Sequence, residues 1–308
     1  MNTAPWLERA WQEFCDRLQS DRLAHALLIR GPQGTAKGQL ASLIVSRLLC
    51  STDQEHACGE CRSCTLRETG AHPDFFSLAP EEGKHQITID KVRDLIGQLS
   101  LTASFSPRKV ALISPAEAMN ASAANALLKS LEEPPGETVM VLISHDTARL
   151  PITIRSRCQN LTVATPDAAQ AVSWLGRQHG LSPEEAAAAL EAAGGSPLRA
   201  LDLHQQGQVA AYRDVQAQLD RLRGQQATVA ATAQSMDNID NDPLWLYLSR
   251  VAADTLRAGF DRLSGASRKR LVDLQQRADR NRQFSRSSVR RDLLLQDWLI
   301  EWSRLDKS

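Results

Sequence analysis

Two patterns of apolar and polar residues divide this chain. In the first half, short apolar runs alternate with longer segments whose apolar positions recur at helical spacing. Five runs have the length and composition of buried strands: 26–29, 75–79, 110–113, 139–144 and 159–163. Because strands that alternate with helices form parallel sheets covered on both faces, we expect an α/β fold here.

The strand pattern stops after about Ala164, and Ala, Leu, Gln and Arg dominate from there. Ser182, Pro183 and Glu185 predict a helix start with a Ser N-cap, Pro in the first turn and a Glu that completes a capping box. The Gly-Gly pair at 194–195 ends that helix, and we expect a loop at 238–243. We predict three domains: an α/β domain at 1–163, a small helical lid at 164–205 and a helical domain at 206–308.

Composition narrows the class of protein. The 308 residues contain 36 Lys and Arg and 36 Asp and Glu, and this balance argues against a chain that coats nucleic acid on its own. The first eleven residues lack the pattern of a secretory signal, and no apolar run approaches the roughly 20 residues of a membrane span. We therefore expect a cytoplasmic protein with no membrane partner.

Four of the six cysteines form a cluster, Cys50-x7-Cys58-x2-Cys61-x2-Cys64. Short C-x2-C turns deliver thiolates to tetrahedral zinc, so we predict a structural zinc site with Cys50 as the fourth ligand. Two alternatives stay open: unrelated thiols in a loop, or a Cys₃His site in which His56 or His72 replaces Cys50.

A damaged phosphate-binding loop follows the first strand. Residues 31–38 read Gly-Pro-Gln-Gly-Thr-Ala-Lys-Gly, so Gly31 and Lys37 match fixed positions of the pattern G-x4-G-K-[ST] and Gly34 lies among its variable positions. Gly31, Gly34 and Lys37 are the candidate phosphate-binding residues. Ala36 replaces the second glycine, and Gly38 removes the hydroxyl that binds Mg²⁺. We expect this degenerate loop to be vestigial, with residual nucleotide binding left open.

The strand that should supply acidic metal ligands lacks them. Residues 110–113 are followed by Ser114 and Pro115, with no Asp or Glu at the strand end. We predict instead that Ser114 and Glu117 form a helix capping box with Pro115 at the first helical position. Without the hydroxyl and the carboxylates, ATP hydrolysis by this chain should be negligible.

Several segments together resemble the AAA+ clamp-loader family of bacterial DNA polymerase III. They are segment 125–135 (Asn-Ala-Leu-Leu-Lys-Ser-Leu-Glu-Glu-Pro-Pro), the triplet Ser156-Arg157-Cys158 before a strand, His72-Pro73-Asp74 and the four-cysteine module. The resemblance covers residues 20–205 well and the last hundred poorly. It implies a RecA-like AAA+ domain, a helical lid and a C-terminal helical collar.

Within that family, the motor subunits keep intact phosphate and metal motifs, and the delta-prime type carries degenerate ones. The changes at Ala36, Gly38, Ser114 and Pro115 resemble the delta-prime type. The resemblance implies a five-subunit ring with motor subunits (gamma or tau) and a delta subunit, which opens the sliding clamp on primer-template DNA. ATP would then be bound only at neighbouring subunits.

Arg157 matches the family's arginine finger, which would reach the γ-phosphate of ATP on a neighbouring motor subunit. Arg199, in Gly195-Ser-Pro-Leu-Arg199, resembles the second sensor of nucleotide-binding subunits, although a surface arginine on a lid helix is favoured there. An active ATPase motor of the same complex is the second hypothesis, and a zinc-dependent nucleic-acid-binding module is the third.

An arginine-rich segment remains near the C-terminus. We favour a solvated helix face for it, with electrostatic contact to DNA as the alternative. Trp298 and Trp302 fall on one helical face and suit either a core or an interface. The basic residues are Arg268, Lys269, Arg270, Arg277, Arg280, Arg282, Arg286, Arg290 and Arg291, with Phe284 nearly alone as an aromatic neighbour.

Overall fold

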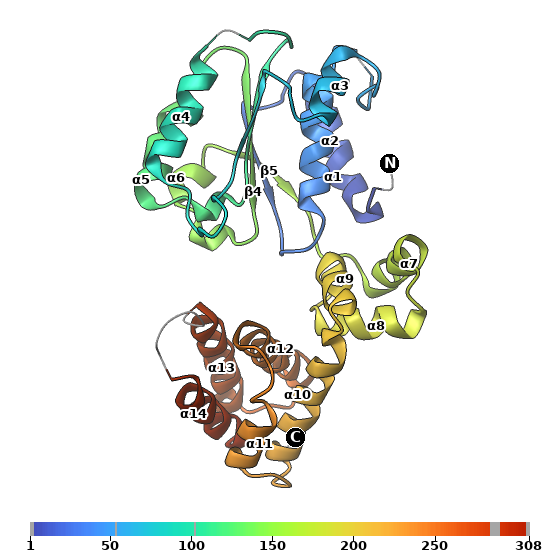
Figure 1. The fold of residues 1–308 in the computed structure, drawn as a ribbon, viewed down its shortest axis with the longest axis vertical. Coiled ribbons are helices and arrows are strands. Elements are labelled where there is room, and N and C mark those ends of the chain that lie inside the picture. Colours follow the sequence, from blue (N-terminus) through green and yellow to red (C-terminus); the bar gives the residue numbers. More distant parts are fainter. Residues whose placement is uncertain (1–2, 53, 102, 284–289, 306–308) are drawn as a thin grey trace. The chain divides into compact units, whose positions relative to one another are not determined.

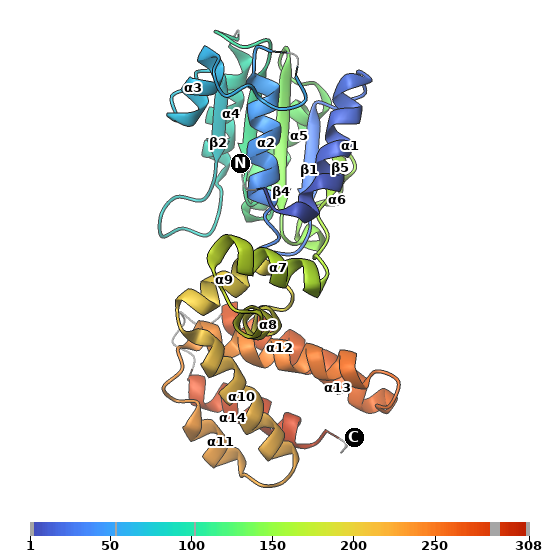
Figure 2. The same cartoon turned by 90° about the vertical axis from the view of Figure 1, so that its right-hand side faces the viewer.

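A computed structural model describes residues 3–52, 54–101, 103–283 and 290–305 of the chain (Figures 1 and 2). The described residues divide into two compact units, Met1–Gly180 with Ser196–Leu198, and Leu181–Gly195 with Arg199–Ser308. Each unit has its own buried apolar core.

The first unit is built on five parallel strands in the order β2-β3-β4-β1-β5. All five predicted strands are confirmed, each within one residue at either end. In register, Leu28 lies beside Leu142 of β4 and Asn160 of β5. The strands are β1 (Ala26–Arg30), β2 (Phe75–Leu78), β3 (Lys109–Ile113), β4 (Thr138–Ser144) and β5 (Gln159–Thr162).

Helices cover both faces of this sheet, as expected for parallel strands (Figure 1). One face packs against α4, α5 and α6, where Leu95, Leu127 and Ile154 meet Leu28 and Leu142 in a shared apolar core. The other face lies beneath α1 and α2 (Figure 1). The helices of this unit are η1 (Pro5–Leu7), α1 (Glu8–Gln19), α2 (Lys37–Leu49), α3 (Arg62–Glu68), α4 (Ile89–Ser100), η2 (Ala116–Ala118), α5 (Ala121–Glu132), η3 (Thr147–Arg149), α6 (Ile152–Arg155) and α7 (Ala168–His179).

The second unit is helical in its described residues. The predicted capping box at Ser182 is confirmed: its side chain accepts from the Glu185 N–H while Glu185 accepts from the Ser182 N–H. The helices are α8 (Pro183–Ala192), α9 (Pro197–Gln205, whose first two residues belong to the first unit), α10 (Gln208–Arg223), α11 (Val229–Ser235), α12 (Asn241–Gly259), α13 (Gly265–Gln283) and α14 (Arg291–Ser303).

Trp298 and Trp302 belong to the core of the second unit. Their rings stack with centroids 5.3 Å apart, and both side chains are buried. Trp298 Nε1 donates to the Leu274 carbonyl at 2.9 Å and Trp302 Nε1 donates to the Leu219 carbonyl at 3.1 Å, so each buried indole is satisfied by a different helix. An interface role for these two rings does not fit this burial.

One detail differs from the sequence-based expectation. The predicted loop at 238–243 was partly wrong, because α12 already begins at Asn241 and carries Pro243 in its first turn, where no hydrogen bond is lost. Helix α7 belongs to the first unit, where its Trp174 packs on Trp6 with ring centroids 5.2 Å apart. The boundaries at 163 and 205 stay a prediction.

Candidate functional site

The four clustered cysteines converge at the C-terminal end of α2. Cys50 is the C-cap of that helix, Cys58 and Cys61 lie in the following loop, and Cys64 lies in α3. Their Sγ atoms all lie within 4.8 Å of one another, with Cys50–Cys58 at 3.7 Å, Cys50–Cys61 at 3.9 Å and Cys58–Cys64 at 4.0 Å. A zinc tetrahedron with Zn–S bonds of about 2.3 Å has edges of about 3.8 Å, so these four residues could hold such an ion.

The backbone around the cluster favours thiolates. The N–H groups of Cys58, Cys61 and Cys64 point at the sulfurs of Cys50, Cys58 and Cys61, at 3.3 to 3.5 Å. Burial opposes ionisation of Cys61, but hydrogen bonds from Ser51 and Cys64 outweigh it and lower the pKa of Cys61 to about 5. At Cys64 burial prevails and raises the pKa to about 12, so the backbone favours the thiolate most at Cys61. Donors aimed at sulfur before any metal arrives suit a preformed, closed metal site.

His72 is engaged elsewhere, which weighs against the Cys₃His alternative. Its Nδ1 accepts from the Asp74 backbone N–H at 3.1 Å, and its Nε2 lies 2.7 Å from Ser63 Oγ and 3.1 Å from Ser106 Oγ. Both ring nitrogens therefore have partners. His56, the other alternative, stacks flat on Trp11 with centroids 4.9 Å apart.

Asp74 anchors the same region from the other side. Its carboxylate accepts the backbone N–H groups of Ser104, Phe105 and Ser106 at 2.7 to 2.8 Å. Burial alone would raise the pKa of Asp74, but these three donors outweigh it and lower that pKa. His72 and Asp74 directly precede strand β2. Their hydrogen bonds connect the start of this strand to helix α3 and to the loop before β3.

At the other end of α2 lies the degenerate phosphate loop. A Cβ at Gly31 would lie 2.0 Å from the Val163 carbonyl oxygen, so only glycine fits there. Ala36 adopts φ 63°, ψ 26°, the left-handed conformation that the missing glycine would take without strain. The loop thus keeps the backbone turn of a phosphate-binding motif, although Ala36 and Gly38 replace the glycine and the Ser or Thr of that motif.

Lys37 points back into its own loop. Its Nζ donates to the Gly31 carbonyl at 2.7 Å and to the Pro32 carbonyl at 2.5 Å, and the residue is 2% exposed. Burial lowers the pKa of Lys37 to about 8, against a smaller opposing effect of Glu117. A phosphate at this loop would have to replace two hydrogen bonds that the ammonium already makes.

The predicted capping box at Ser114 and Glu117 was wrong. Pro115 occupies the N-cap of η2 and offers no side-chain oxygen, and the next helix, α5, is capped by Asn120, which accepts from the Ala123 N–H at 2.8 Å. Glu117 instead reaches across to the end of β4. Its Oε1 accepts the backbone N–H groups of His145 at 2.8 Å and Asp146 at 3.2 Å.

Glu117 and Lys37 face the same small region. The pKa of His145 is held below its usual range by burial and, secondly, by the charge of Lys37. Glu117 Oε2, His145 Nδ1 and Ser144 Oγ are buried without a hydrogen-bond partner within the described ranges. In an ATPase, these strand ends would hold metal and water. Here one oxygen of Glu117 accepts the backbone N–H groups of His145 and Asp146, and the Asp146 carboxylate accepts the Ala148 N–H.

Arg157 follows α6 and reaches the surface. Its Nε donates to Glu132 Oε1 at 2.7 Å and its Nη1 donates to the Thr153 carbonyl at 2.9 Å, and its side chain is 34% exposed. The next residue, Cys158, packs as a small side chain in the apolar core, and burial raises its pKa to about 12. Glu132, which the sequence reasoning did not single out, holds Arg157 in place.

The sequence of this chain matches a known protein family. The family described as DNA polymerase III, delta subunit, matches residues 6–167. The chain is 38% identical to DNA polymerase III subunit delta' of Pseudomonas aeruginosa, across 98% of this chain and 97% of that protein. This chain belongs to the DNA polymerase III delta-prime family.

A second delta-prime subunit agrees with this assignment, and one solved structure shares the fold. The chain is 40% identical to subunit delta' of Escherichia coli, across 67% of this chain and 62% of that protein. The crystal structure of a DNA polymerase III gamma subunit-related protein from Thermotoga maritima is similar in fold, with a TM-score of 0.51 at 19% identity, covering 95% of this chain and 99% of that one. The AAA+ clamp-loader fold and membership of the clamp-loader family are thereby established.

Three other sequence-based expectations for this delta-prime family member concern Arg199, the arginine-rich segment and membrane spans. Arg199 is partly buried, and burial, then the charges of Arg282 and Arg250, lower its pKa, so it is not a plain surface residue. Within the arginine-rich segment, Phe284 and Arg286 lie outside the described residues. Among the described helices, none is long and apolar enough to cross a membrane.

Proposed function

We propose that this delta-prime family member is a non-hydrolysing AAA+ subunit of a cytoplasmic clamp loader. It assembles with gamma or tau motor subunits and a delta subunit, and meets the sliding clamp and primer-template DNA through that complex. Arg157 serves in trans as the arginine finger of a neighbouring motor subunit, where ATP is bound.

The state of Lys37 carries the first half of this proposal. In an ATPase, this lysine contacts the β- and γ-phosphates, a loop hydroxyl binds Mg²⁺, and a carboxylate after the third strand completes the metal site. Here the ammonium is bound by Gly31 and Pro32 carbonyls, Gly38 has no side chain, and β3 runs into Ser114 and Pro115. A metal clamp contributes several kcal/mol to the transition state, and about 1.4 kcal/mol is tenfold in rate.

The setting of Arg157 supports the second half. A finger must be solvent-accessible, always charged and held at a fixed place, and guanidinium offers a planar fork to phosphate oxygens. Arg157 is partly exposed, and Glu132 and the Thr153 carbonyl orient it without burying it. An exposed ion pair contributes little stability, so phosphate could replace Glu132 at small cost.

The cysteine cluster would hold zinc as a structural ion. Four thiolates leave no open coordination position, and bound zinc would supply order to the loop between α2 and α3. We propose Cys50, Cys58, Cys61 and Cys64 as its ligands, and a lid and a collar domain at the boundaries predicted from the sequence.

ATP turnover by the purified chain separates this proposal from the motor hypothesis. We expect no sustained hydrolysis above a buffer control, with or without primed DNA. Sustained turnover that the Lys37→Ala variant abolishes would establish a motor subunit instead.

The finger role is tested in a complex reconstituted with the motor subunits. Arg157→Ala should fold and assemble, but the ATP site that it serves should slow by roughly 10³-fold or more, and DNA-stimulated turnover should fall by that site's share. Arg157→Lys should not restore turnover, because an ammonium keeps the charge but lacks the fork. The matched control is Arg149→Ala, an exposed arginine in η3 that should leave turnover unchanged.

A further inference from the structure

Helix α13 and the residues that follow it up to Arg291 carry a positive charge excess that the proposed function does not use. Residues 265–291 contain nine Lys and Arg but only two Asp and Glu, in a chain whose net charge is zero. Such an excess on one short segment produces a local positive potential that the composition of the whole chain hides. The residues of this segment that the structure describes show which side of α13 carries the basic side chains.

A groove of about 480 Å³ lies along α13 and reaches Glu301 of α14. Four of its lining side chains are cations that recur along one side of α13 at helical spacing: Lys269, Arg270, Arg277 and Arg280. From the first to the last of these residues, α13 rises about 16 Å, which equals the axial rise of roughly five nucleotides in one strand of duplex DNA.

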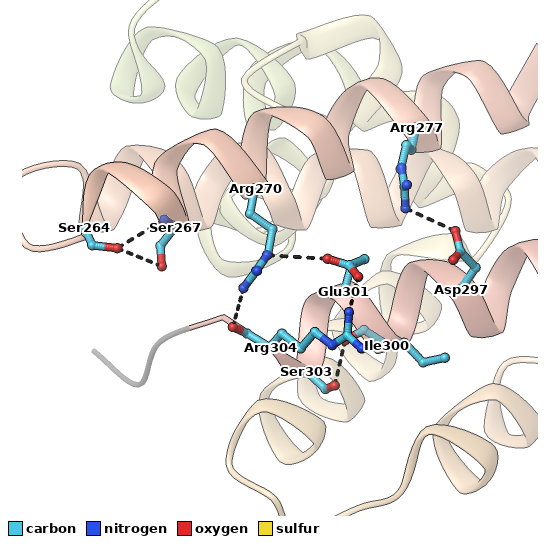
Figure 3. Close-up of polar contacts among 9 residues, drawn as sticks. All are labelled: Ser264, Ser267, Arg270, Arg277, Asp297, Ile300, Glu301, Ser303 and Arg304. Atoms are coloured by element: carbon cyan, nitrogen blue, oxygen red, sulfur yellow. Dashed lines mark hydrogen bonds and ion pairs between the residues drawn. The ribbon is translucent and has the colours of Figure 1, made fainter.

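Two of these arginines are held in position by acidic or carbonyl partners (Figure 3). Arg270 lies 3.4 Å from Glu301 and donates to the Arg304 carbonyl at 2.6 Å, and Arg277 donates to Asp297 at 3.1 Å. Side chains that are already ordered lose less conformational freedom when they bind a ligand. Because Asp297 is well exposed, Arg277 can exchange it for another anion at little cost.

The other two cations have no such partner. Lys269 and Arg280 are exposed and form no ion pair or hydrogen bond with any residue that the structure describes. They lie at the two ends of the row, with the anchored Arg270 and Arg277 between them. The groove therefore offers two unpaired cations and two arginines that are fixed but partly exposed.

The chemistry of the lining favours phosphate over a protein segment. A protein partner is usually anchored by apolar or aromatic side chains at the centre of the interface. The exposed large apolar side chains from α12 to α14 among the described residues are Val272, Leu293, Ile300 and, in the turn after α12, Phe260, and none of them lines this groove. Its lining as described also contains no aromatic ring on which a base could stack, so the ligand would be backbone rather than bases.

We propose that this groove on α13 is a binding site for the sugar-phosphate backbone of DNA, independent of sequence. Lys269 and Arg280 contact phosphates directly, and Arg277 joins them by releasing Asp297. The site goes beyond the proposed role of Arg157, because it would give the chain its own contact with the DNA on which the complex acts.

The test measures binding of the full chain to a labelled duplex of mixed sequence, by fluorescence anisotropy over a series of salt concentrations. The variant is Lys269→Glu with Arg280→Glu. The matched control is Arg213→Glu with Arg221→Glu on α10, which changes the net charge equally and also alters exposed arginines without a partner in the described chain. Circular dichroism checks that both fold; if the first does not, the Gln variants at the same positions replace it.

We expect the groove variant to bind at least about tenfold more weakly, and its plot of log K against log salt to lose about 1.8 from its slope, since each phosphate contact contributes about 0.9. The control should retain most of the affinity and the full slope. Equal losses in the two variants, or no binding by the unaltered chain at low salt, would overturn the proposal.

Asp273 provides a test in the opposite direction. This exposed carboxylate lines the groove one turn from both Lys269 and Arg277, so Asp273→Asn should tighten DNA binding by about threefold. A damaged fold cannot produce such a gain. If a Glu-rich peptide binds the groove more tightly than duplex DNA at the same salt concentration, the ligand is an acidic protein segment and the DNA assignment is wrong.

Discussion

Helix α2 has a candidate ligand site at each end, and the two differ in how many ligand residues they keep. At its C-terminal end, Cys50 meets three other thiols at tetrahedral spacing, and backbone N–H groups point at their sulfurs. At its N-terminal end, Lys37 faces the carbonyls of its own loop, and the positions that would bind Mg²⁺ are Gly38, Ser114 and Pro115. The C-terminal end therefore keeps four possible metal ligands, and the N-terminal end keeps only the backbone turn of a phosphate-binding loop.

The contrast shows which part of a motif the fold itself needs. The turn at the phosphate loop connects β1 to α2, and Gly31 is required by the approach of the Val163 carbonyl whether or not phosphate binds. The metal ligands are needed only for chemistry and can be replaced without loss of the turn. The cysteines differ, because the loop between α2 and α3 has few apolar residues and depends on a ligand for order.

Removing a metal ligand should have the largest effect on the stability of the first unit. Cys61→Ser is expected to abolish retention of one zinc per chain, and to destabilise that unit by on the order of 5 kcal/mol, because zinc binding energy is folding energy for such a loop. Metal content by mass spectrometry and chemical denaturation measure the two effects.

Two variants sharpen that result. Cys15→Ala removes a buried thiol outside the cluster and should leave one zinc per chain. His72→Ala should also retain the metal, although it loses the hydrogen bonds to Ser63 and Asp74 and weakens the fold. Loss of zinc in the His72 variant at intact folding would show that histidine is a ligand after all.

At the opposite end of α2, Lys37→Met tests the burial of the ammonium through its pH dependence. Burial lowers the pKa of Lys37 to about 8 from 10.5, so between these pH values the unfolded chain binds more protons than the folded one. The native protein should therefore gain stability relative to the variant as pH rises from 8 toward 10.5, by about 2 to 3 kcal/mol. Well below pH 8, where Lys37 is protonated in both the folded and the unfolded state, the difference should be constant.

Denaturant unfolding of both proteins at pH 7, 8, 9 and 10 gives this difference directly. Burial raises the pKa of Cys15 and of Tyr247, but both residues are present in both proteins, so their contributions cancel. A difference that does not change with pH would mean that Lys37 is solvated and free to meet a ligand, and the contrast between the two ends of α2 would be lost.

Much of this fold could be predicted from the sequence, because its signals are local. Five apolar runs became five strands, the Cys spacing located the cluster, and Ser182 with Glu185 located a helix start. Each of these signals is contained in a segment of about fifteen residues or fewer, because helical or strand periodicity, capping and ligand spacing depend on residues that are close in sequence.

The parts that could not be predicted depend on contacts between distant segments. Glu117 fits a local capping box, yet it bonds backbone 28 residues away after β4. Glu132 holds Arg157 across 25 residues, and Trp302 finds its acceptor 83 residues earlier, at Leu219. The choice between core and interface for Trp298 and Trp302 depended on such acceptors, and the sequence alone does not place them.

The smallest expected effect concerns Ala36, and it measures how much strain the altered loop retains. Left-handed alanine costs about 1 to 2 kcal/mol. Ala36→Gly removes that cost but loses a buried methyl, about 0.8 kcal/mol, and adds about 0.4 to 1 kcal/mol of unfolded-state entropy. These terms nearly cancel, so the free energy of unfolding should change by less than about 0.5 kcal/mol.

The matched control lies five residues further along α2. Ala41 is also buried but sits inside the helix, so Ala41→Gly should cost about 2 kcal/mol from propensity and the lost methyl. The difference between the two variants reports the strain at Ala36. Equal losses of unfolding free energy in the two variants would mean that residue 36 is unstrained. The loop would then have lost the backbone turn of the phosphate-binding motif as well as its ligand residues.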